Sequence, residues 1–245
     1  MLKELEDHNW FPAILRRWQM EFIGNMAVWT KLYQPLAPVL QQLIQQNKIT
    51  ALQDTCSGSG IPAVYIHQQL ANKIPLLLTD KYPDLSFKNS EAITYAAPTA
   101  DVLKMEFNNS ACYTMYNAFH HFSNEEQQLL LKRFSEAGTS FLIAEILEPS
   151  VLNVLKIAVT GIVLQLFTAP FVRPFSWARL FFTYIIPVNL FTVTYDGIIS
   201  VLKSKTVQQY AAMLKNDTTA YIITVDTIKN WKGNIVYLKG QPVNL

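Results

Sequence analysis

The stretch that decides the fold is "ITALQDTCSGSGIPA", residues 49–63. A short apolar run ends at Asp54, a cluster of Cys, Ser and Gly follows, and apolar sequence resumes at Ile61. A glycine-rich turn after the first strand of an α/β sheet brings backbone N–H groups and a helix N-terminus close to a ligand. Gly58 and Gly60 permit such a turn. Many tight strand-to-helix connections also use glycine, so the glycines alone leave both interpretations open.

Segments typical of strands and helices alternate after this turn. Ser123, with Glu126 three residues later, is a capping box that predicts a helix over 123–137. Strands that alternate with crossover helices predict an α/β fold with a parallel sheet. The pattern predicts strands at 49–54, 74–80, 111–119 and 139–147, a helix at 61–72, and a weakly helical segment at 86–95.

The two ends of the chain differ from this alternation. Apolar residues at helical spacing predict helices over 10–32 and 35–47. Near the other end, "AYIITVDTI" (220–228) and "NIVYLKG" (234–240) flank "KNWKGN" (229–234), a turn-like loop. We therefore expect an antiparallel hairpin that closes the sheet.

Residues 151–195 are unusually apolar, with no acidic residue between Glu148 and Asp196. The first apolar run, 157–172, is shorter than the about 20 residues of a comfortable membrane span, and the second, 180–193, contains a proline. We expect a hydrophobic helical insertion that packs on the domain, on a partner or into one leaflet rather than two spans. Asp196 either closes a pocket or caps a helix.

Composition narrows the function classes. The chain has 245 residues, a net charge of +2 and no basic run, which disfavours a nucleic-acid binder. Two cysteines cannot form a disulfide framework or a Cys-based zinc site. "MLKELEDHNWFP" shows no apolar h-region, so we expect no signal peptide and a cytoplasmic, reducing compartment, with an option of peripheral contact at the inner membrane.

Two acids indicate the kind of ligand. Asp80 ends the second predicted strand, twenty residues after Gly60, where a carboxylate can reach the ribose hydroxyls of a nucleotide. Asp54 would repel a pyrophosphate but suits a cationic amino group. The third glycine of a dinucleotide fingerprint is also missing. These features favour S-adenosylmethionine over NAD or FAD and disfavour a nicotinamide-dependent oxidoreductase.

The chain resembles the class I S-adenosylmethionine-dependent methyltransferases in "DTCSGSG" (54–60), "LLTD" (77–80), "TAD" (99–101), "MYNAFHHFS" (115–123) and "FLIAEILEP" (141–149). "NWFPAILRRWQMEFI" (9–23) and "YDGIISVLKSKTVQQYAAML" (195–214) also resemble a hydrophobic bacterial branch of this family. The resemblance implies a Rossmann-like, seven-stranded, mostly parallel sheet. Cys56 departs from the family, whose motif carries a glycine there.

The resemblance also implies roles for particular residues. Asp54 would lie near the methionine amino group, Asp80 would hold the ribose, and Asp101 would accept from the adenine amino group. Each acid has an ordinary alternative, a solvated strand end or, for Asp101, a helix N-cap. The full set of implied cofactor-binding residues is Asp54, Thr55, Cys56, Gly58, Gly60, Asp80, Lys81, Asp101, Val102, Asn117 and Tyr33. Tyr33 also suits a role in lid packing.

Three residues are candidates for catalysis. His120 or His121 could take a proton from a phenol during methyl transfer, although adjacent histidines cannot both face one site. Glu145, at the end of the fifth predicted strand, could serve a protonated amine or simply pair with a basic residue. We expect no metal site, because adjacent histidines are poor co-ligands and no third ligand is apparent.

We therefore expect one methyltransferase domain over 1–245, with a helical lid (1–48), a cofactor-binding core (49–150), a hydrophobic insertion (151–215) and a hairpin (216–245). The expected reaction transfers a methyl group to a hydrophobic small-molecule or lipid-like acceptor. Oxygen is favoured as the methylated atom, with carbon and nitrogen open. The alternative is a non-catalytic scaffold whose insertion (151–195) binds a membrane, a partner or a second copy.

Overall fold

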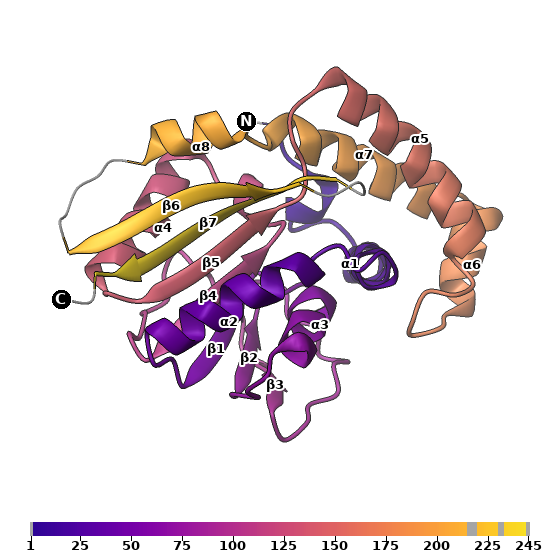
Figure 1. Ribbon diagram of the computed structural model, residues 1–245. Helices are drawn as coiled ribbons and strands as arrows, with labels where there is room; N and C mark the ends of the chain where they lie inside the picture. Colours follow the sequence, from indigo (N-terminus) through magenta and orange to yellow (C-terminus); the bar gives the residue numbers. More distant parts are fainter. Residues whose placement is uncertain (1, 215–219, 230–232, 244–245) are drawn as a thin grey trace.

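The computed structural model describes residues 2–214, 220–229 and 233–243. Within these ranges, seven strands form one sheet in the order β3-β2-β1-β4-β5-β7-β6 (Figure 1). Neighbours from β3 to β5 are parallel, whereas β7 runs antiparallel to both β5 and β6. This confirms the predicted sheet and its closing hairpin. The strands are β1 (Ala51–Thr55), β2 (Leu76–Thr79), β3 (Ile93–Tyr95), β4 (Ala111–Tyr116), β5 (Ser140–Glu145), β6 (Tyr221–Ile228) and β7 (Ile235–Pro242).

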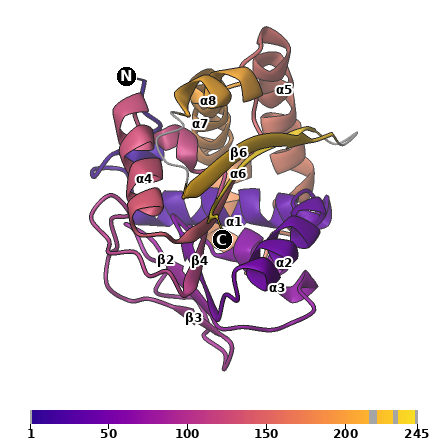
Figure 2. The ribbon, with the colours of Figure 1, turned by 60° about the vertical axis from the view of Figure 1, so that its left-hand side comes forward.

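Helices cover both faces of the sheet, and Figure 2 shows α4 on one side of the strands and α2 with α3 on the other. The capping box at Ser123 is present, and both of its hydrogen bonds form. The helices are α1 (Ala13–Trp29), α2 (Ala37–Gln46), α3 (Ile61–Gln69), α4 (Asn124–Glu136), α5 (Val151–Thr168), α6 (Trp177–Tyr184), α7 (Val188–Lys203) and α8 (Val207–Met213). Three short 3₁₀ turns are η1 (Leu5–Asp7), η2 (Gln34–Leu36) and η3 (Phe119–His121).

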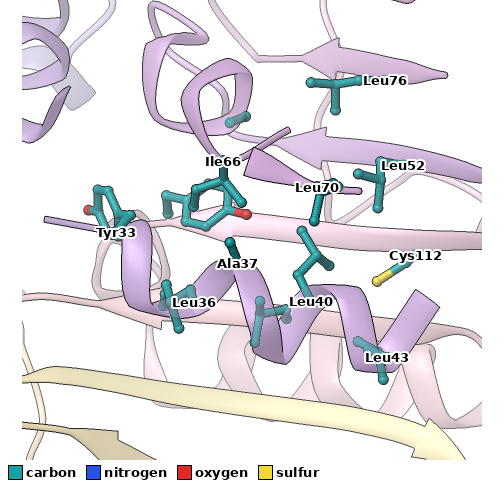
Figure 3. Close-up of a cluster of buried hydrophobic side chains, with 14 of the residues drawn as sticks. Tyr33, Leu36, Ala37, Leu40, Leu43, Leu52, Ile66, Leu70, Leu76 and Cys112 are labelled. Carbon is teal, nitrogen blue, oxygen red and sulfur yellow. The ribbon is translucent and has the colours of Figure 1, made fainter. Parts of the chain in front are cut away.

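The core consists of two layers because side chains alternate across each strand. On β4, Cys112 and Tyr116 join the layer beneath α2 and α3, which Figure 3 shows with Leu40 and Leu43 of α2. Tyr113 and Met115 face the opposite layer, beneath α4 and α8. The central parallel strands β4 and β5 are thus buried on both faces, as continuous apolar runs predict.

One predicted element is wrong. The segment 86–95 is not helical; it holds loops and the three-residue strand β3, which pairs with Leu76–Leu78 of β2. The backbone ladder to β2 decides its conformation, and a strand this short leaves no alternation to detect. The loop predicted at 229–234 lies partly outside the described residues, at 230–232.

The insertion is helical, as predicted. α5 begins at Val151, where Ser150 caps it by accepting from the Asn153 N–H, and it ends just before Pro170. Pro187 precedes α7. Figure 1 shows α5, α6 and α7 gathered beside α1, beyond the carboxyl ends of the parallel strands. Within the described ranges, α5 is long and apolar enough to cross a membrane, and α6 with α7 would add a second span only across a 79° bend.

Candidate functional site

The turn after β1 has the backbone that a glycine-rich ligand loop requires. Cys56, Gly58 and Gly60 have φ values of 55°, 53° and 71°, in the left-handed region. Only glycine adopts this region freely, so Cys56 is strained where the family carries glycine. Gly60 then starts α3. Cys56 therefore differs from the glycine expected at this position in its side chain, but it has the same left-handed backbone conformation.

Asp54 lies buried at the end of β1. Its Oδ1 accepts a hydrogen bond from the Thr114 hydroxyl at 2.6 Å, and the side chain is 2% exposed. Burial raises the pKa of Asp54 to about 7, and the charge of Asp80 adds to this rise. A carboxyl group that is costly to ionise in this position would be stabilised as an anion by a cationic ligand.

Asp80 follows β2 and contacts the turn directly. Its Oδ2 accepts from the Gly58 N–H at 2.8 Å, and its Oδ1 accepts from the Tyr82 N–H at 2.7 Å. Burial raises its pKa above the ordinary value, while these two backbone hydrogen bonds oppose the rise. The structure thus places the two predicted acids on adjacent strand ends, on either side of the turn.

The thiol of Cys56 marks where the carboxylates converge. Burial raises the pKa of this thiol well above its ordinary value, and the charges of Asp80, Asp54, Asp101 and Asp7 raise it further. Asp101 is also at the head of a turn, where its Oδ1 accepts from the Leu103 N–H at 3.1 Å. Residues 102–104 form a turn and not a helix, so Asp101 caps a turn and not a helix, and its other carboxylate oxygen lies 3.7 Å from the Lys104 ammonium.

The other predicted cofactor residues divide into two groups. Asn117, directly after β4, has a left-handed backbone (φ 53°), and Val102 is buried. Tyr33 packs in the core against Tyr116, with ring centres 5.4 Å apart. Burial raises the pKa of Tyr33 well above its ordinary value, and the charges of Glu145 and Asp54 raise it further. Two other predicted residues have no side chain directed to the acids of the turn. Lys81 is exposed, and the Thr55 hydroxyl donates to the Thr114 carbonyl within the sheet.

Helix α1 covers the turn. The Ser59 hydroxyl donates to the Met20 carbonyl at 3.2 Å, and a Cβ added at Gly58 would lie 2.9 Å from the Met20 sulfur. A side chain at this position would therefore have to displace the Met20 side chain. The N-terminal segment expected to form a lid does lie against the candidate ligand loop.

A histidine–glutamate pair lies at the ends of β4 and β5. The Nδ1 of His120 is 2.6 Å from Oε2 of Glu145, and the other Glu145 oxygen accepts from the Phe119 N–H at 2.7 Å. Both side chains are fully buried. The His120 Nε2 is also buried but makes no hydrogen bond within the described structure. The imidazole is thus oriented by an acid on one side and has an unused nitrogen on the other.

His121 points to the N-terminal segment instead. Its Nδ1 is 2.9 Å from Asp7, and its Nε2 is 3.5 Å from Glu4. Burial opposes protonation, but Glu4, Asp7 and Glu6 outweigh it and raise the pKa of His121 to about 9. The two Nδ1 atoms contact different acids, Glu145 and Asp7. Both Nε2 atoms nevertheless lie within 3.7 Å of Glu4, so the expectation that the two histidines cannot face one site is wrong in this respect.

Sequence reasoning missed the acids of residues 4–7. Asp196 on α7 anchors this segment, because its carboxylate accepts from the N–H groups of Leu5 and Glu6 at 2.6 and 3.2 Å. Asp196 therefore neither caps a helix nor lines an open pocket. Glu4 is 2% exposed and lies 3.7 Å from the His120 Nε2. No local sequence signal pairs residues that are so far apart in the chain.

The expectation that no third metal ligand exists is wrong in one respect. Ligand atoms of Glu4, His120 and His121 lie within 4.8 Å of one another. A cation already contacts this group, since the Lys203 ammonium lies 3.0 Å from Glu4 Oε1. Lys203 thus offers Glu4 the positive charge that a metal ion would otherwise supply.

Comparisons with known proteins give distant structural neighbours only. No family model and no curated protein matches the sequence. The solved structures of human N-acetylserotonin methyltransferase with SAM and of the mitomycin 7-O-methyltransferase MmcR are 13% and 11% identical, with TM-scores of 0.49 and 0.48. Each match covers 86% of this chain, which spans about half of those chains (52% and 54%). The pyocyanin biosynthetic protein PhzM is 11% identical over 78% of this chain and 50% of its own, with a TM-score of 0.47.

The seven-stranded order with an antiparallel β7 is an α/β fold with a mostly parallel sheet. The named neighbours include a methyltransferase solved with SAM and a 7-O-methyltransferase, but likeness at this level carries no argument about function. The chemistry has to be argued from the residues of this chain.

Proposed function

We propose that this protein is an S-adenosylmethionine-dependent methyltransferase. The observation that carries the proposal is the pair of carboxylates at the left-handed turn, since Asp54 lies at the end of β1 and Asp80 accepts from the Gly58 N–H. The segment of Asp101 reaches the same place, because the Ala100 N–H donates to the Asp80 carbonyl at 2.9 Å. A carboxylate cluster at a glycine-rich turn disfavours phosphate and favours a nucleoside with a cationic end. S-adenosylmethionine is such a ligand, with an amino group, a sulfonium and ribose hydroxyls.

The residues present fit this cofactor. Asp54 would hold the amino group, Asp80 the ribose hydroxyls and Asp101 the adenine amino group, with Val102 beside the base. When bound, the cofactor supplies a methyl group that its sulfonium already activates. The protein's main tasks are then to position the acceptor and to exclude water.

His120 is the proposed general base. Glu145 fixes the imidazole through Nδ1, so a proton from an acceptor hydroxyl would be taken at Nε2, the buried atom that has no hydrogen-bond partner within the described structure. Glu145 would also stabilise the imidazolium that forms. A hydroxyl acceptor needs such a base, so the pair favours O-methylation. His121, bonded to Asp7, is assigned a structural role instead of a catalytic one.

Glu4 limits access to this base in the conformation described. Its Oε1 lies 3.7 Å from the His120 Nε2 and 3.0 Å from the Lys203 ammonium. An acceptor hydroxyl would therefore reach His120 beside or in place of Glu4. We propose an apolar acceptor, because the neighbouring insertion exposes many large hydrophobic side chains.

Calorimetry with two ligands tests the cofactor assignment. S-adenosylhomocysteine carries the amino-acid end, whereas 5′-methylthioadenosine carries the nucleoside alone. Asp80→Ala should abolish binding of both, and Asp54→Asn should weaken only S-adenosylhomocysteine, by more than about tenfold. Asp226→Asn, on the exposed edge strand β6, is the matched control. Absence of binding to the unaltered protein would refute the proposal, and unchanged affinity in Asp80→Ala would remove that residue from the site.

The second candidate is a non-catalytic scaffold with the same fold. The observation that favours it is the position of Glu4, whose carboxylate lies beside the unused His120 nitrogen, where an acceptor would have to bind. Under this alternative the fold would present the apolar insertion to a membrane or partner. Binding of S-adenosylhomocysteine in calorimetry or a thermal-shift assay would argue against it.

A further inference from the structure

We propose that the outward side of the insertion is a docking surface for an anionic lipid bilayer. Its exposed apolar side chains would insert into one leaflet only. This docking face consists of the exposed apolar side chains of α5, α6 and α7, together with those of the connections at 169–176 and 185–187. The inference rests on the proposed function in one respect, which is that the bilayer would supply the apolar acceptor of the methyl transfer. The docking itself can be tested without methyl transfer.

The first observation is the extent of exposed apolar surface. Half of the eighteen residues of α5 are large hydrophobic residues with exposed side chains, and only 6% of the helix is buried. At the far end, Phe167 is 74% exposed, Phe171 64% and Trp177 78%. Soluble monomers rarely leave contiguous apolar patches beyond a few hundred Å² in water, so a surface of this kind indicates a partner or a membrane.

The second observation concerns the attachment of the insertion. The 169–176 connection is tied to α1, because Asn25 exchanges hydrogen bonds with the backbone of Arg173 and buried Arg179 pairs with Glu21 at 2.5 Å. The other end of α5 follows β5 directly, and α5 packs against α7 through Gly161, where a Cβ would lie 3.0 Å from the Thr194 hydroxyl. Both ends of α5 are thus held on the same domain. α5 therefore does not cross a membrane, and its exposed side suits one leaflet.

The third observation is charge. The only charged side chains between Glu148 and Asp196 are Lys156, Arg173 and Arg179. Arg179 is buried and paired, whereas Lys156 and Arg173 are exposed. Anionic headgroups offer these two cations counter-charges beside an apolar layer. Aromatic residues such as Trp177 suit the boundary between headgroups and hydrocarbon.

The same charge pattern disfavours a second copy of the chain as the occupant. A two-fold dimer places the same patch on both subunits. The docking face contains no carboxylate, so its own copy offers Lys156 and Arg173 no opposite charge. A lipid surface satisfies both the apolar and the cationic side chains, and for this reason we commit to it.

Helix α7 connects the docking face with the candidate site. Phe191 is 65% exposed on its outward side. On its inward side Asp196 accepts from the Leu5 N–H, and Lys203 pairs with Glu4 beside His120. An acceptor held in the leaflet would thus lie next to the helix that anchors residues 4–7.

Vesicle flotation tests the proposal, using the full chain and vesicles of phosphatidylcholine with and without phosphatidylglycerol. The unaltered protein should float with the anionic vesicles. Phe171→Ser combined with Trp177→Ser should reduce binding more than about tenfold, since two large apolar groups no longer enter the bilayer. Lys156→Gln and Arg173→Gln should each weaken binding to anionic vesicles about fivefold. Leu85→Ser is the matched control, because Leu85 is 77% exposed on a loop outside the insertion.

Several results would overturn the proposal. The first is failure of the unaltered protein to float with vesicles at low salt. The second is a loss of vesicle binding in Leu85→Ser as large as that in the Phe171→Ser, Trp177→Ser variant. The third is a dimer in detergent-free buffer that is absent in the Phe171→Ser, Trp177→Ser variant, when neither protein binds vesicles. Circular dichroism establishes whether each variant is folded. The substituted side chains are exposed, so we expect the fold to tolerate their replacement. S-adenosylhomocysteine binding measured in parallel separates the two proposals. A protein that binds this ligand but not vesicles keeps the proposed function and loses the docking face.

Discussion

The Nδ1 atom of His120 lies 2.6 Å from Oε2 of Glu145, although 25 residues separate the two in the chain. They meet because β4 and β5 are adjacent and parallel, so their carboxyl ends share one edge of the sheet. Glu145 also accepts from the Phe119 N–H. The acid thus fixes both the imidazole and the turn that carries it.

Replacement of Glu145 by Ala should destabilise the protein by about 3 kcal/mol or more, because a buried N–H and a buried imidazole lose their acceptor. Glu145→Gln should cost less, since its amide oxygen can still accept from Phe119. Urea denaturation measures both free energies of unfolding. Glu91→Ala, at an exposed loop position, is the control. Equal stability of Glu145→Ala and the control would contradict the assigned contacts.

Asp54→Asn should change how stability depends on pH. The folded-state pKa of Asp54 is raised to about 7 from an ordinary value of 3.8, so the folded protein binds the extra proton between these values. Stability from this group is therefore present at low pH and lost as pH rises from about 4 to 7. The Asn variant should lose less stability over this window than the unaltered protein. Thermal melts of both proteins at pH 5 and pH 8, without ligand, measure the loss of stability over this window. An equal loss in the two proteins would mean that the pKa of Asp54 is not raised.

His121→Asn tests the contacts to residues 4–7. The pKa of His121 is raised from 6.5 to about 9, so its contribution is fully present below about pH 6.5 and is lost as pH rises through 9. The variant should be less stable than the unaltered protein at pH 6, by at most roughly 3 kcal/mol, and the gap should close by pH 9.5. Urea titrations at the two pH values check this. A gap that does not vary with pH would mean that His121 acts through packing alone.

Cys56→Gly should be tolerated although it removes a half-buried side chain. The left-handed backbone at φ 55° costs a cysteine about 1–3 kcal/mol, which glycine avoids. We expect a change in unfolding free energy within about 1 kcal/mol, whereas the β-branched Cys56→Val should lose more than about 2 kcal/mol. Chemical denaturation of both variants decides the matter. A loss in Cys56→Gly as large as that in Cys56→Val would refute the strain.

Arg179→Met should loosen the insertion from α1. The Arg179 guanidinium lies 2.5 Å from a Glu21 oxygen, and both side chains are 4% exposed. Removing the cation leaves Glu21 buried, with Arg17 at 3.6 Å as its remaining charged partner, so we expect a loss of about 3–5 kcal/mol. The double variant Glu21→Gln, Arg179→Met should recover part of it. Hydrogen exchange in α6 and α1 would localise the effect, and a double variant no better than the single one would contradict it.

Local sequence patterns predicted most of the fold. Ser123 and Glu126 fixed the start of α4 because a capping box needs only four residues, and continuous apolar runs indicated the buried strands. The segment 86–95 was misjudged because β3 depends on its ladder to β2. No helix limits were predicted inside the insertion, where Ser150 caps the start of α5.

The candidate site was only half predictable. Asp54 and Asp80 follow from their positions at strand ends, since parallel strand ends meet at one edge, whereas Asp101 was implied by the family resemblance alone. Asp7 and Glu4 contact His121, and Asp196 holds their segment, through contacts that span more than a hundred residues. Such contacts arise from tertiary packing, and a single sequence carries no local signal for them.

The anchoring of Glu4 has a consequence for the order of folding. Two of its hydrogen-bond partners, Ser200 and Lys203, are 196 and 199 residues away. During synthesis, residues 4–7 are made before α7 and gain these partners only when α7 has left the ribosome. The sheet strands β1 to β5 also precede that helix in the chain. Residues 4–7 are therefore made before the five strands, but they can take their place beside His120 only after α7 is available.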